Sequence, residues 1–263
     1  MIKHVLTIAG SDSGGGAGIQ ADLKTFSALG TYGLSVITAI TAQNTQGVTG
    51  IEILSPFIVE KQLDAVFKDI RIDAVKIGMV ASRELIKVIV QAINRFQPKI
   101  IIVDPVMVST TGSRLLEEDA IEEIKQHLFP IATLITPNLQ EAAVLLETEL
   151  QSLKDLFQVA VKLKQFTVGE VLITGGHNVL GDQVIDVLST GEAFMSERIE
   201  TKHTHGTGCS LSSAIAVFMA QGLTLSKAVQ KAKQYVTKGL YHAYPIGSGA
   251  GPIHHFHALW NDL

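Results

Sequence analysis

The chain has 263 residues, of which 46% are hydrophobic and 17% charged, and it carries a formal net charge of −4 with a pI near 6.1. This length and composition allow a sizeable core, whereas the acidic balance and the absence of a lysine- and arginine-rich cluster argue against nucleic acid as a partner. One cysteine excludes an internal disulfide, and the apolar stretch at residues 5–9 is too short for a signal peptide or a membrane span, so we expect a cytoplasmic protein that acts on a small molecule.

The first predicted strand covers residues 5–9 and runs directly into a glycine-rich segment, residues 10–18. Apolar residues at helical spacing from Ile19 to Leu29 predict a helix after it. A strand, a glycine loop and a helix in this order commonly precede a ligand site in an open α/β sheet. The segment has neither Gly-Lys-Ser/Thr nor G-x-G-x-x-G, which weakens a nucleotide-phosphate role. A flexible turn beneath a substrate is the alternative interpretation.

A second strand is predicted over residues 34–40, followed by a polar loop over residues 41–47 that contains Gln43. Such a loop either lines a binding pocket or is simply solvated. The pattern next predicts a strand over residues 48–54, a helix from Pro56, a strand over residues 74–77 that leads to Gly78 and Met79, and a helix over residues 82–96.

An acidic residue follows the most apolar stretch of the chain. Residues 100–103 are continuously apolar, as expected of a strand buried on both faces of a parallel sheet. Asp104 would then lie at the carboxyl end of a central strand, where ligands bind in this architecture. After a short strand at residues 134–136, the spacing of Asn138 and Glu141 fits a helix N-cap with its answering acid, and equally a magnesium ligand that acts through water.

The segment from His203 to Ala214 carries the clearest chemical pattern. Gly206, Thr207 and Gly208 run directly into a helix predicted to continue to about residue 220. A helix that begins in this way leaves backbone N–H groups unpaired at its positive end, so a phosphate is the natural occupant. We expect Cys209 at that end, with its thiolate favoured and its pKa lowered. A tight turn beside a packing cysteine is the alternative.

The remaining segments complete the pattern. Strand 171–174 meets Gly175 and Gly176, residues 184–188 and 193–199 predict an edge hairpin, and apolar spacing from Leu225 to Val236 predicts a helix. The tail holds His254, His255 and His257, whose spacing matches no standard zinc signature. We interpret these histidines as surface or packing residues.

Repeated strand–loop–helix units predict a three-layer α/β/α sandwich with a mostly parallel central sheet, in one domain that covers residues 1–263. Because the loops that follow parallel strands gather at one edge, the polar segments named above would meet there. Phosphoryl transfer needs in-line positioning, neutralised charge on the moving group and a route for the acceptor's proton. Backbone N–H groups of residues 206–209 would hold the phosphate, Asp104 and Glu141 would keep magnesium on a triphosphate, and Cys209 would accept the proton.

Several motifs of this chain can be compared with known families. They are Thr7-Ile8-Ala9-Gly10-Ser11-Asp12, the segment from Gly14 to Thr25, Asp104-Pro105-Val106-Met107, Thr136-Pro137-Asn138 with Glu141, and the segment from Thr204 to Cys209. Together they closely resemble the hydroxymethylpyrimidine/phosphomethylpyrimidine kinases of thiamin biosynthesis, which belong to the ribokinase-like superfamily. The resemblance extends from the first strand to the tail at residues 252–257.

This resemblance implies a ribokinase-like fold, a homodimer, and the phosphorylation of 4-amino-5-hydroxymethyl-2-methylpyrimidine (HMP) by ATP and Mg²⁺, first to HMP phosphate and then to HMP diphosphate. It implies that Gln43 bonds the aminopyrimidine and that Cys209 faces the reacting hydroxyl. The residues implied around the ring are Ala17, Asp22, Met79 and Val106, and those implied at ATP are Asp104, Asn138, Glu141, Thr174 and Gly175.

One position departs from the family pattern, since Thr174 stands where some members have a lysine expected to reach the ATP phosphates. The nearest alternative function is a pyridoxal, pyridoxine or pyridoxamine kinase, because the same cysteine-bearing branch acts on that ring. Gln43 favours HMP, since its amide offers both a donor and an acceptor to an aminopyrimidine edge. A non-catalytic ligand-binding protein is the alternative of another class, against which the joint presence of Asp104, Glu141 and Cys209 argues.

Overall fold

The computed structural model describes residues 1–107, 118–149, 155–176, 179–180 and 182–260. Within these residues ten strands form one sheet, in which nine follow the order β10-β9-β7-β6-β5-β4-β1-β2-β3 and β8 pairs with β9. The strands are β1 (His4–Asp12), β2 (Tyr32–Asn44), β3 (Gly47–Ile53), β4 (Ala74–Ile77), β5 (Ile101–Val103), β6 (Leu134–Ile135), β7 (Glu170–Ile173), β8 (Val179–Leu180), β9 (Gln183–Leu188) and β10 (Ala193–Glu197).

The strands from β2 through β1, β4, β5 and β6 to β7 pair in parallel. At one edge β3 joins antiparallel to β2, and at the other the hairpin β9–β10 joins antiparallel to β7. The predicted mostly parallel sheet and the predicted edge hairpin are therefore confirmed.

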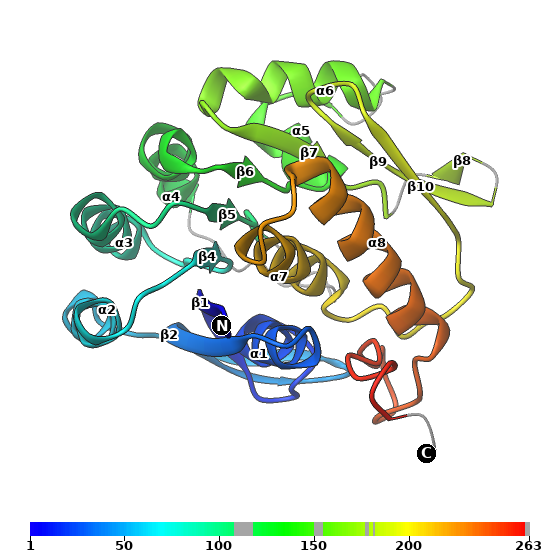
Figure 1. The fold of residues 1–263 in the computed structure, drawn as a ribbon, viewed down its shortest axis with the longest axis horizontal. Helices are drawn as coiled ribbons and strands as arrows, with labels where there is room; N and C mark the ends of the chain where they lie inside the picture. The colour runs from blue at the N-terminus through cyan, green and yellow to red at the C-terminus, as the bar shows by residue number, and fades with distance from the viewer. Residues whose placement is uncertain (108–117, 150–154, 177–178, 181, 261–263) are drawn as a thin grey trace.

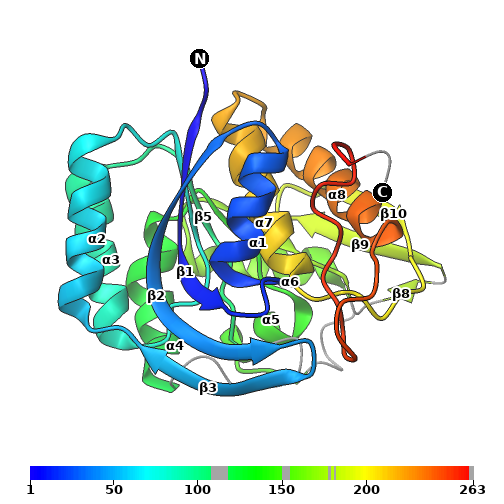
Figure 2. The same ribbon diagram turned by 90° about the horizontal axis from the view of Figure 1, so that it is seen from below.

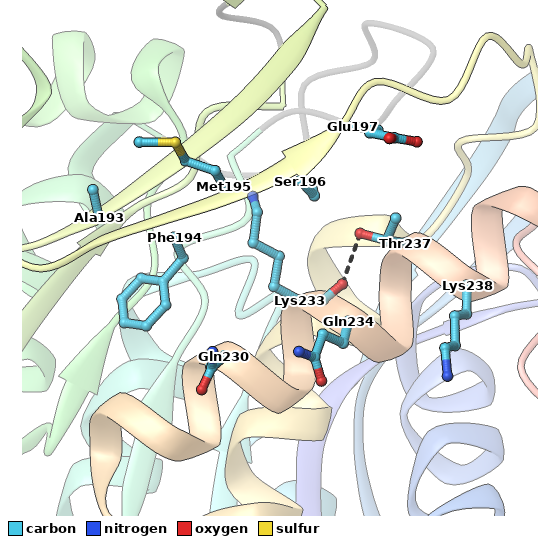
Figure 3. A pocket seen from close by; sticks show the side chains of 10 residues that line it. All are labelled: Ala193, Phe194, Met195, Ser196, Glu197, Gln230, Lys233, Gln234, Thr237 and Lys238. Carbon is cyan, nitrogen blue, oxygen red and sulfur yellow. Dashed lines mark hydrogen bonds between the residues drawn. The ribbon is translucent and has the colours of Figure 1, made fainter.

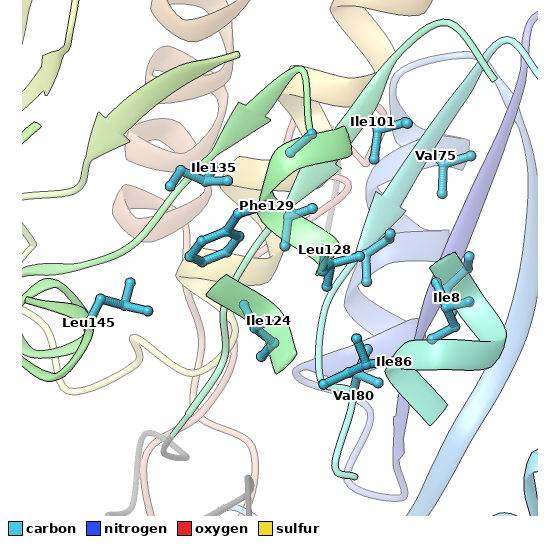
Figure 4. Close-up of a cluster of buried hydrophobic side chains, with 14 of the residues drawn as sticks. Ile8, Val75, Val80, Ile86, Ile101, Ile124, Leu128, Phe129, Ile135 and Leu145 are labelled. Carbon is cyan, nitrogen blue, oxygen red and sulfur yellow. The ribbon is translucent and has the colours of Figure 1, made fainter. Parts of the chain in front are cut away.

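Helices cover both faces of the sheet (Figure 1). They are α1 (Gly18–Ala28), α2 (Pro56–Asp69), α3 (Arg83–Phe96), α4 (Glu118–Glu123), α5 (Leu139–Leu145), α6 (Leu156–Leu163), α7 (Thr207–Ala220) and α8 (Leu225–Tyr241). A π turn (Ile124–Leu128) and a 3₁₀ turn (Phe129–Ile131) follow α4, and a 3₁₀ turn (Lys164–Phe166) follows α6. Helices α1, α7 and α8 pack on one apolar core, and α2 to α6 pack on another (Figure 4). This is the predicted three-layer sandwich.

Strand β5 shows how the sequence produces these two cores. Ile101 and Val103 belong to the core beneath α2 to α6, whereas Ile102 belongs to the core beneath α1, α7 and α8. Successive side chains of a strand point to opposite faces, so a strand covered on both sides must be apolar at every position. The following residue, Asp104, is thereby placed at the carboxyl edge of the sheet.

The prediction of a polar loop over residues 41–47 is wrong. Residues 41–44 continue β2, and β3 begins at Gly47, so only two residues separate the strands. In that extension Thr41 pairs with Ile51 of β3 and Gln43 pairs with Val48. Since β1 ends at Asp12, which pairs with Thr41, the β2–β3 hairpin extends beyond the carboxyl end of β1 (Figure 2). The positions of its polar side chains are therefore determined by strand pairing and not by a loop. In the part of the chain that the structure describes, no helix has the length and apolar character of a membrane span.

Candidate active site

The carboxyl ends of the parallel strands bring the predicted site segments to one edge of the sheet (Figure 2). The glycine loop follows β1, Met79 lies just after β4, Asp104 follows β5, Asn138 lies just after β6, and Thr174 follows β7. The start of α7 packs against the first of these segments, as the glycines show. The expected gathering of loops is therefore present.

Two glycine segments interlock at this edge. Gly206, which precedes α7, has a φ of 79°, a conformation that favours glycine. A Cβ atom on Gly206 would lie 1.9 Å from the carbonyl oxygen of Gly16, and a Cβ atom on Gly16 would lie 2.3 Å from Cδ2 of His205. Neither position has room for a side chain, so the first turn of α7 lies directly against the glycine loop.

Asp12, whose role the sequence did not reveal, organises the glycine loop. Its Oδ1 accepts a hydrogen bond from the N–H of Gly14 (2.8 Å), and its Oδ2 accepts from those of Gly16 (2.9 Å) and Ala17 (2.8 Å). Nε2 of His205 lies 2.9 Å from the same Oδ2. Although burial alone would raise it, these hydrogen bonds hold the pKa of Asp12 below its usual value. An aspartate two residues before a glycine is a local turn signal that could have suggested this role.

The start of α7 presents unpaired backbone donors. The N–H of Thr207 reaches the carbonyl oxygen of Thr204 at 3.3 Å, and the N–H of Ser210 bonds the carbonyl oxygen of Gly206 at 2.9 Å. The N–H groups of Gly208 and Cys209 have no acceptor among the residues that the structure describes. Gly208 is exposed and Cys209 is partly exposed. Two free N–H groups at the positive end of a helix form a binding site suited to an anion.

The expectation of a lowered pKa at Cys209 is wrong. Burial is the main influence that raises the pKa of the thiol, and the charges of Asp104 and Asp22 add to it. The Lys76 ammonium and the Gly18 N–H act in the opposite direction, and the net result is a pKa of about 12. The sequence indicated the helix start but could not show the desolvation or the two carboxylates. At neutral pH the group is therefore a thiol, which can donate a hydrogen bond but does not accept a proton readily.

Two acidic side chains are buried beside one another at the edge. Asp104 is 5% exposed and accepts a hydrogen bond from the hydroxyl of Ser212 at 2.9 Å. Burial raises the pKa of Asp104, and Lys76 opposes that shift. Burial and the negative charge of Asp104 raise the pKa of Glu141 to about 8. Two neighbouring carboxylates repel one another when both are ionised, and a bound cation would remove this repulsion. Because Mg²⁺ prefers carboxylate oxygens, the residues present fit a bound Mg²⁺.

Glu141 also caps helix α5. Its N–H bonds Oδ1 of Asn138, and its Oε2 accepts from the N–H of Asn138, each at 2.9 Å. This reciprocal arrangement confirms the predicted capping pair. The carboxylate also accepts a hydrogen bond from the N–H of Met107. Because each carboxylate oxygen has two acceptor sites, these two bonds do not exclude the second predicted role.

The residues predicted around the substrate ring are only partly brought together. Met79 and Val106 pack in one small apolar cluster with Ala39 and Ala81. Nε2 of Gln43 lies 3.2 Å from Nε2 of His205, next to the loop that contains Ala17. The side chain of Asp22 is different, because it is 0% exposed and paired with Lys76. The expected contact of this carboxylate with a ring is therefore not supported, since the helix and sheet enclose it.

Thr174 and Gly175, both predicted to lie at ATP, differ in their exposure and in the partners of their N–H groups. Thr174 is partly exposed, and its N–H bonds the carbonyl oxygen of Pro137. The N–H of Gly175 donates to Oδ1 of Asp186 at 2.9 Å, and a Cβ atom there would lie 1.9 Å from the carbonyl oxygen of Ile185. The Gly175 N–H is therefore already used, and this glycine serves close packing against β9. The prediction that Gly175 contacts ATP therefore gains no support from this N–H.

A cavity of about 370 Å³ lies between β10 and α8 (Figure 3). Lys233 is among the residues that line it, and its Nζ lies 2.7 Å from Oδ2 of Asp186, the same carboxylate that bonds Gly175. Sequence reasoning missed this cavity, because α8 and the hairpin that form it come from separate segments.

Of the tail histidines, His255 is buried, whereas His254 and His257 are partly exposed. His255 is 4% exposed, its Nε2 lies 3.0 Å from the hydroxyl of Ser210 in the first turn of α7, and burial lowers its pKa to about 3. His257 lies against the ring of Tyr235. The interpretation of these two as packing residues agrees with their positions.

Comparison with known proteins places this site in a family. The family model described as phosphomethylpyrimidine kinase matches residues 12–254. The chain belongs to the phosphomethylpyrimidine kinase family. Within this family, the hydroxymethylpyrimidine/phosphomethylpyrimidine kinase of Rhizobium meliloti (strain 1021) is 49% identical over 268 residues, which cover 100% of both chains.

Two further proteins show the extent of the similarity. The thiamine biosynthesis bifunctional protein ThiED of Geobacter sulfurreducens is 48% identical over 95% of this chain, which spans 52% of that longer protein. The crystal structure of Bacillus subtilis pyridoxal kinase in complex with ADP is 34% identical, with a TM-score of 0.91 over 99% of this chain and 100% of that chain. The predicted resemblance to phosphomethylpyrimidine kinases and the predicted ribokinase-like α/β fold are confirmed.

Proposed function

We propose that this chain transfers the terminal phosphoryl group of ATP to the hydroxyl of HMP, and then a second one to HMP phosphate, in thiamin biosynthesis. The name of the Rhizobium meliloti relative, which matches over its full length, supports this activity, and the name of the longer Geobacter sulfurreducens protein supports the pathway. The observation that carries it is the start of α7, where the N–H groups of Gly208 and Cys209 lack acceptors among the described residues at the edge shared with Asp104. Donors held ready for developing negative charge are what phosphoryl transfer needs from a protein.

In this proposal the pyrimidine lies beside Gln43. The Gln43 amide presents both a donor and an acceptor, and Met79 and Val106 form an apolar surface for a flat ring. Ala17 adds a small side chain at the glycine loop. Asp22 supports the site from below rather than by contact with the ring, because its carboxylate is fully buried.

We propose that Asp104 and Glu141 hold Mg²⁺, at least partly through water, and that Asn138 and Thr174 lie near the phosphates of ATP. Bound Mg²⁺ supplies positive charge that neutralises the phosphate oxygens. The buried hydroxyl of Thr136, which has no hydrogen-bond partner among the described residues, is a further polar group close to Asp104, since the N–H of Thr136 bonds the carbonyl oxygen of Val103. The cavity between β10 and α8 is our candidate for the nucleoside end of ATP.

We propose that Cys209 acts as a neutral thiol that orients the acceptor hydroxyl, because its raised pKa makes a thiolate base unfavourable. A loose transition state requires removal of the acceptor's proton only late in the reaction. We further propose a cytoplasmic homodimer in which residues 1–263 form one domain.

A pyridoxal kinase is the second candidate, because a pyridoxal kinase of Bacillus subtilis has a closely similar fold. Release of ADP, measured with purified chain, ATP and Mg²⁺, separates the candidates when HMP, HMP phosphate and pyridoxal are compared. We expect ADP release with HMP and HMP phosphate at much higher kcat/KM than with pyridoxal. A preference for pyridoxal would contradict the proposal, and no ADP release with any of them would favour a non-catalytic binding protein.

The variant Gln43→Met sharpens this comparison. It removes the donor and acceptor offered to the aminopyrimidine while keeping side-chain volume. We expect kcat/KM for HMP to fall about tenfold or more, as for the loss of hydrogen bonds to a polar substrate edge, with a smaller change for pyridoxine. An equal loss for both would contradict the assignment of Gln43.

A further inference from the structure

Lys76 is a charged side chain that lies wholly inside the protein. It belongs to β4, and its side chain and that of Asp22 are both 0% exposed. Its Nζ donates to Oδ1 and Oδ2 of Asp22, each at 3.0 Å. An apolar pair of similar volume often stabilises a core at least as well as a buried ion pair. A lysine at this position therefore suggests a role beyond packing.

Asp22 holds the ammonium group in one place. Oδ2 of Asp22 also accepts a hydrogen bond from the hydroxyl of Thr7 at 2.6 Å, and Oδ1 accepts from that of Ser213 at 2.7 Å. These side chains come from β1 and α7, so the carboxylate is fixed by the sheet and by the helix layer together. A charge fixed in this way does not need to reorganise when charge develops nearby.

The ammonium group lies just beneath the edge that contains the candidate site. A Cβ atom on Gly78, the first residue after β4, would lie 2.7 Å from Nζ of Lys76. Helix α7 places Cys209, Ser212 and Ser213 on one face, because they are spaced by three and four residues. Ser212 binds Asp104, and Ser213 binds Asp22. One turn of α7 therefore connects the thiol, the Asp104 carboxylate and the partner of Lys76.

The charge of Lys76 acts on the thiol. At Cys209, burial is the largest influence on the pKa, and Lys76 is the largest influence that opposes it. Although burial lowers the pKa of Lys76, the negative charge of Asp22 and its hydrogen bond to the ammonium group, helped by Asp104, raise it overall. Lys76 therefore remains charged at neutral pH.

We propose that Lys76 is a positioning residue for phosphoryl transfer, whose buried charge supplies positive potential beneath Cys209 and Asp104 and so favours negative charge in the space between them. The proposal rests on the proposed function of this edge and deepens it. The ammonium group does not touch the substrate. It acts through the thiol and the carboxylate above it, in a low-dielectric environment where a fixed charge has a strong effect.

A purely structural ion pair is the competing explanation, and the protein contains a matched control for it. Lys233 and Asp186 form a second buried pair, 2.7 Å apart, with side chains 8% and 5% exposed. Neither residue is among the charges that shift the pKa of Cys209. Loss of the Lys233 charge should therefore affect stability without changing the reactivity of the thiol.

The test uses Cys209 itself as the probe, because it is the only cysteine of the chain. Alkylation by iodoacetamide is measured between about pH 7 and 9 without ATP or Mg²⁺, since the thiolate is the reactive form. We expect the rate in Lys76→Met to fall about tenfold or more, as for the loss of a close opposite charge. The double variant Asp22→Asn/Lys76→Met should show a smaller fall, because Asp22 acts in the opposite direction, and Lys233→Met should show none.

Thermal unfolding identifies variants that do not fold, and the double variant keeps the test available because it leaves no unpaired buried charge. An alkylation rate in the folded double variant equal to that of the unmodified chain would overturn the proposal. A fall in Lys233→Met as large as in Lys76→Met would also overturn it.

Steady-state kinetics provides the second readout. The proposal predicts a lower kcat in the folded Lys76→Met and Asp22→Asn/Lys76→Met variants with little change in KM for HMP, and an unchanged kcat in these two variants would contradict it. Because alkylation requires no catalysis, it decides the electrostatic role of Lys76 even if the chain phosphorylates a different alcohol.

Discussion

Two helices begin at the same edge of the sheet, and they treat their first N–H groups in opposite ways. Helix α5 begins at Asn138 and Glu141, whose side chains close a reciprocal cap. Helix α7 begins at Gly206, which has no side chain to cap it, and leaves the N–H groups of Gly208 and Cys209 without acceptors among the described residues. A capped helix start therefore stabilises the fold, whereas a helix start that is preceded by glycine leaves its N–H groups available to bind an anion.

The largest effect should come from displacing the first turn of α7. In Gly206→Ala, the new Cβ atom would meet the carbonyl oxygen of Gly16, so the first turn of α7 must move. We expect kcat/KM for HMP to fall at least about a hundredfold, as when a donor to a transition-state oxygen is lost. Gly30→Ala is the control, because Gly30 has a φ of 77° with no neighbour within 4 Å. A similar loss of activity in both variants would indicate backbone strain alone.

The next effect concerns the thiol beside the free donors. Cys209→Ala should lower kcat about a hundredfold while ATP still binds, whereas Cys209→Ser should keep much of the activity because a hydroxyl can also orient the acceptor. ADP release and ATP titration measure the two properties. Equal inactivity of both variants would show that a thiolate base is required, and unchanged turnover in Cys209→Ala would show that the thiol only packs.

A smaller effect is expected from a variant that removes the charge of Glu141 but keeps its role in the cap of α5. Glu141→Gln keeps an oxygen that can bond the N–H of Asn138, because glutamine also serves in a capping box. The variant removes a carboxylate proposed to hold Mg²⁺. We expect the apparent Mg²⁺ affinity to fall about tenfold, as when a metal-site contact is lost, and an unchanged Mg²⁺ dependence would limit Glu141 to the cap.

The same variant tests the pH dependence of stability. The pKa of Glu141 is raised from 4.5 to about 8, so the folded state binds more protons than the unfolded state between these values. Without Mg²⁺, the free energy of unfolding should therefore fall as pH rises through this range, by at most about 1.4 kcal/mol per pH unit. Glu141→Gln should flatten this slope in urea unfolding, and an identical slope in both proteins would contradict the raised pKa.

The smallest effect should come from removing the N-cap side chain of α5. Asn138→Ala removes the side chain that accepts from the N–H of Glu141. We expect it to lower the free energy of unfolding by about 1 kcal/mol, the usual cost of losing a cap, as measured in urea. No loss of stability would show that α5 does not depend on this cap. If Asn138 also contacts ATP, as proposed, the KM for ATP should rise as well.

The sequence predicted those features that depend on local pattern. The apolar stretch before Asp104, the glycines before α7 and the spacing of Asn138 and Glu141 indicate strand ends and helix starts, and parallel pairing then brings them together. Features that depend on distant partners were not predictable in this way. Gln43 belongs to a strand because β3 pairs with it, and the pKa of Cys209 depends on burial and on charges from Asp22, Lys76 and Asp104. Lys76 lies 54 positions from its partner Asp22 in the sequence, and no local sequence motif indicates that the two residues pair.

The most direct test is a crystal structure of the chain with HMP, ADP, Mg²⁺ and aluminium fluoride, a mimic of the migrating phosphoryl group. We predict that the mimic accepts hydrogen bonds from the N–H groups of Gly208 and Cys209, with the HMP hydroxyl beside the Cys209 sulfur. A mimic bound elsewhere, with those two N–H groups facing solvent, would contradict the proposed role of the α7 start.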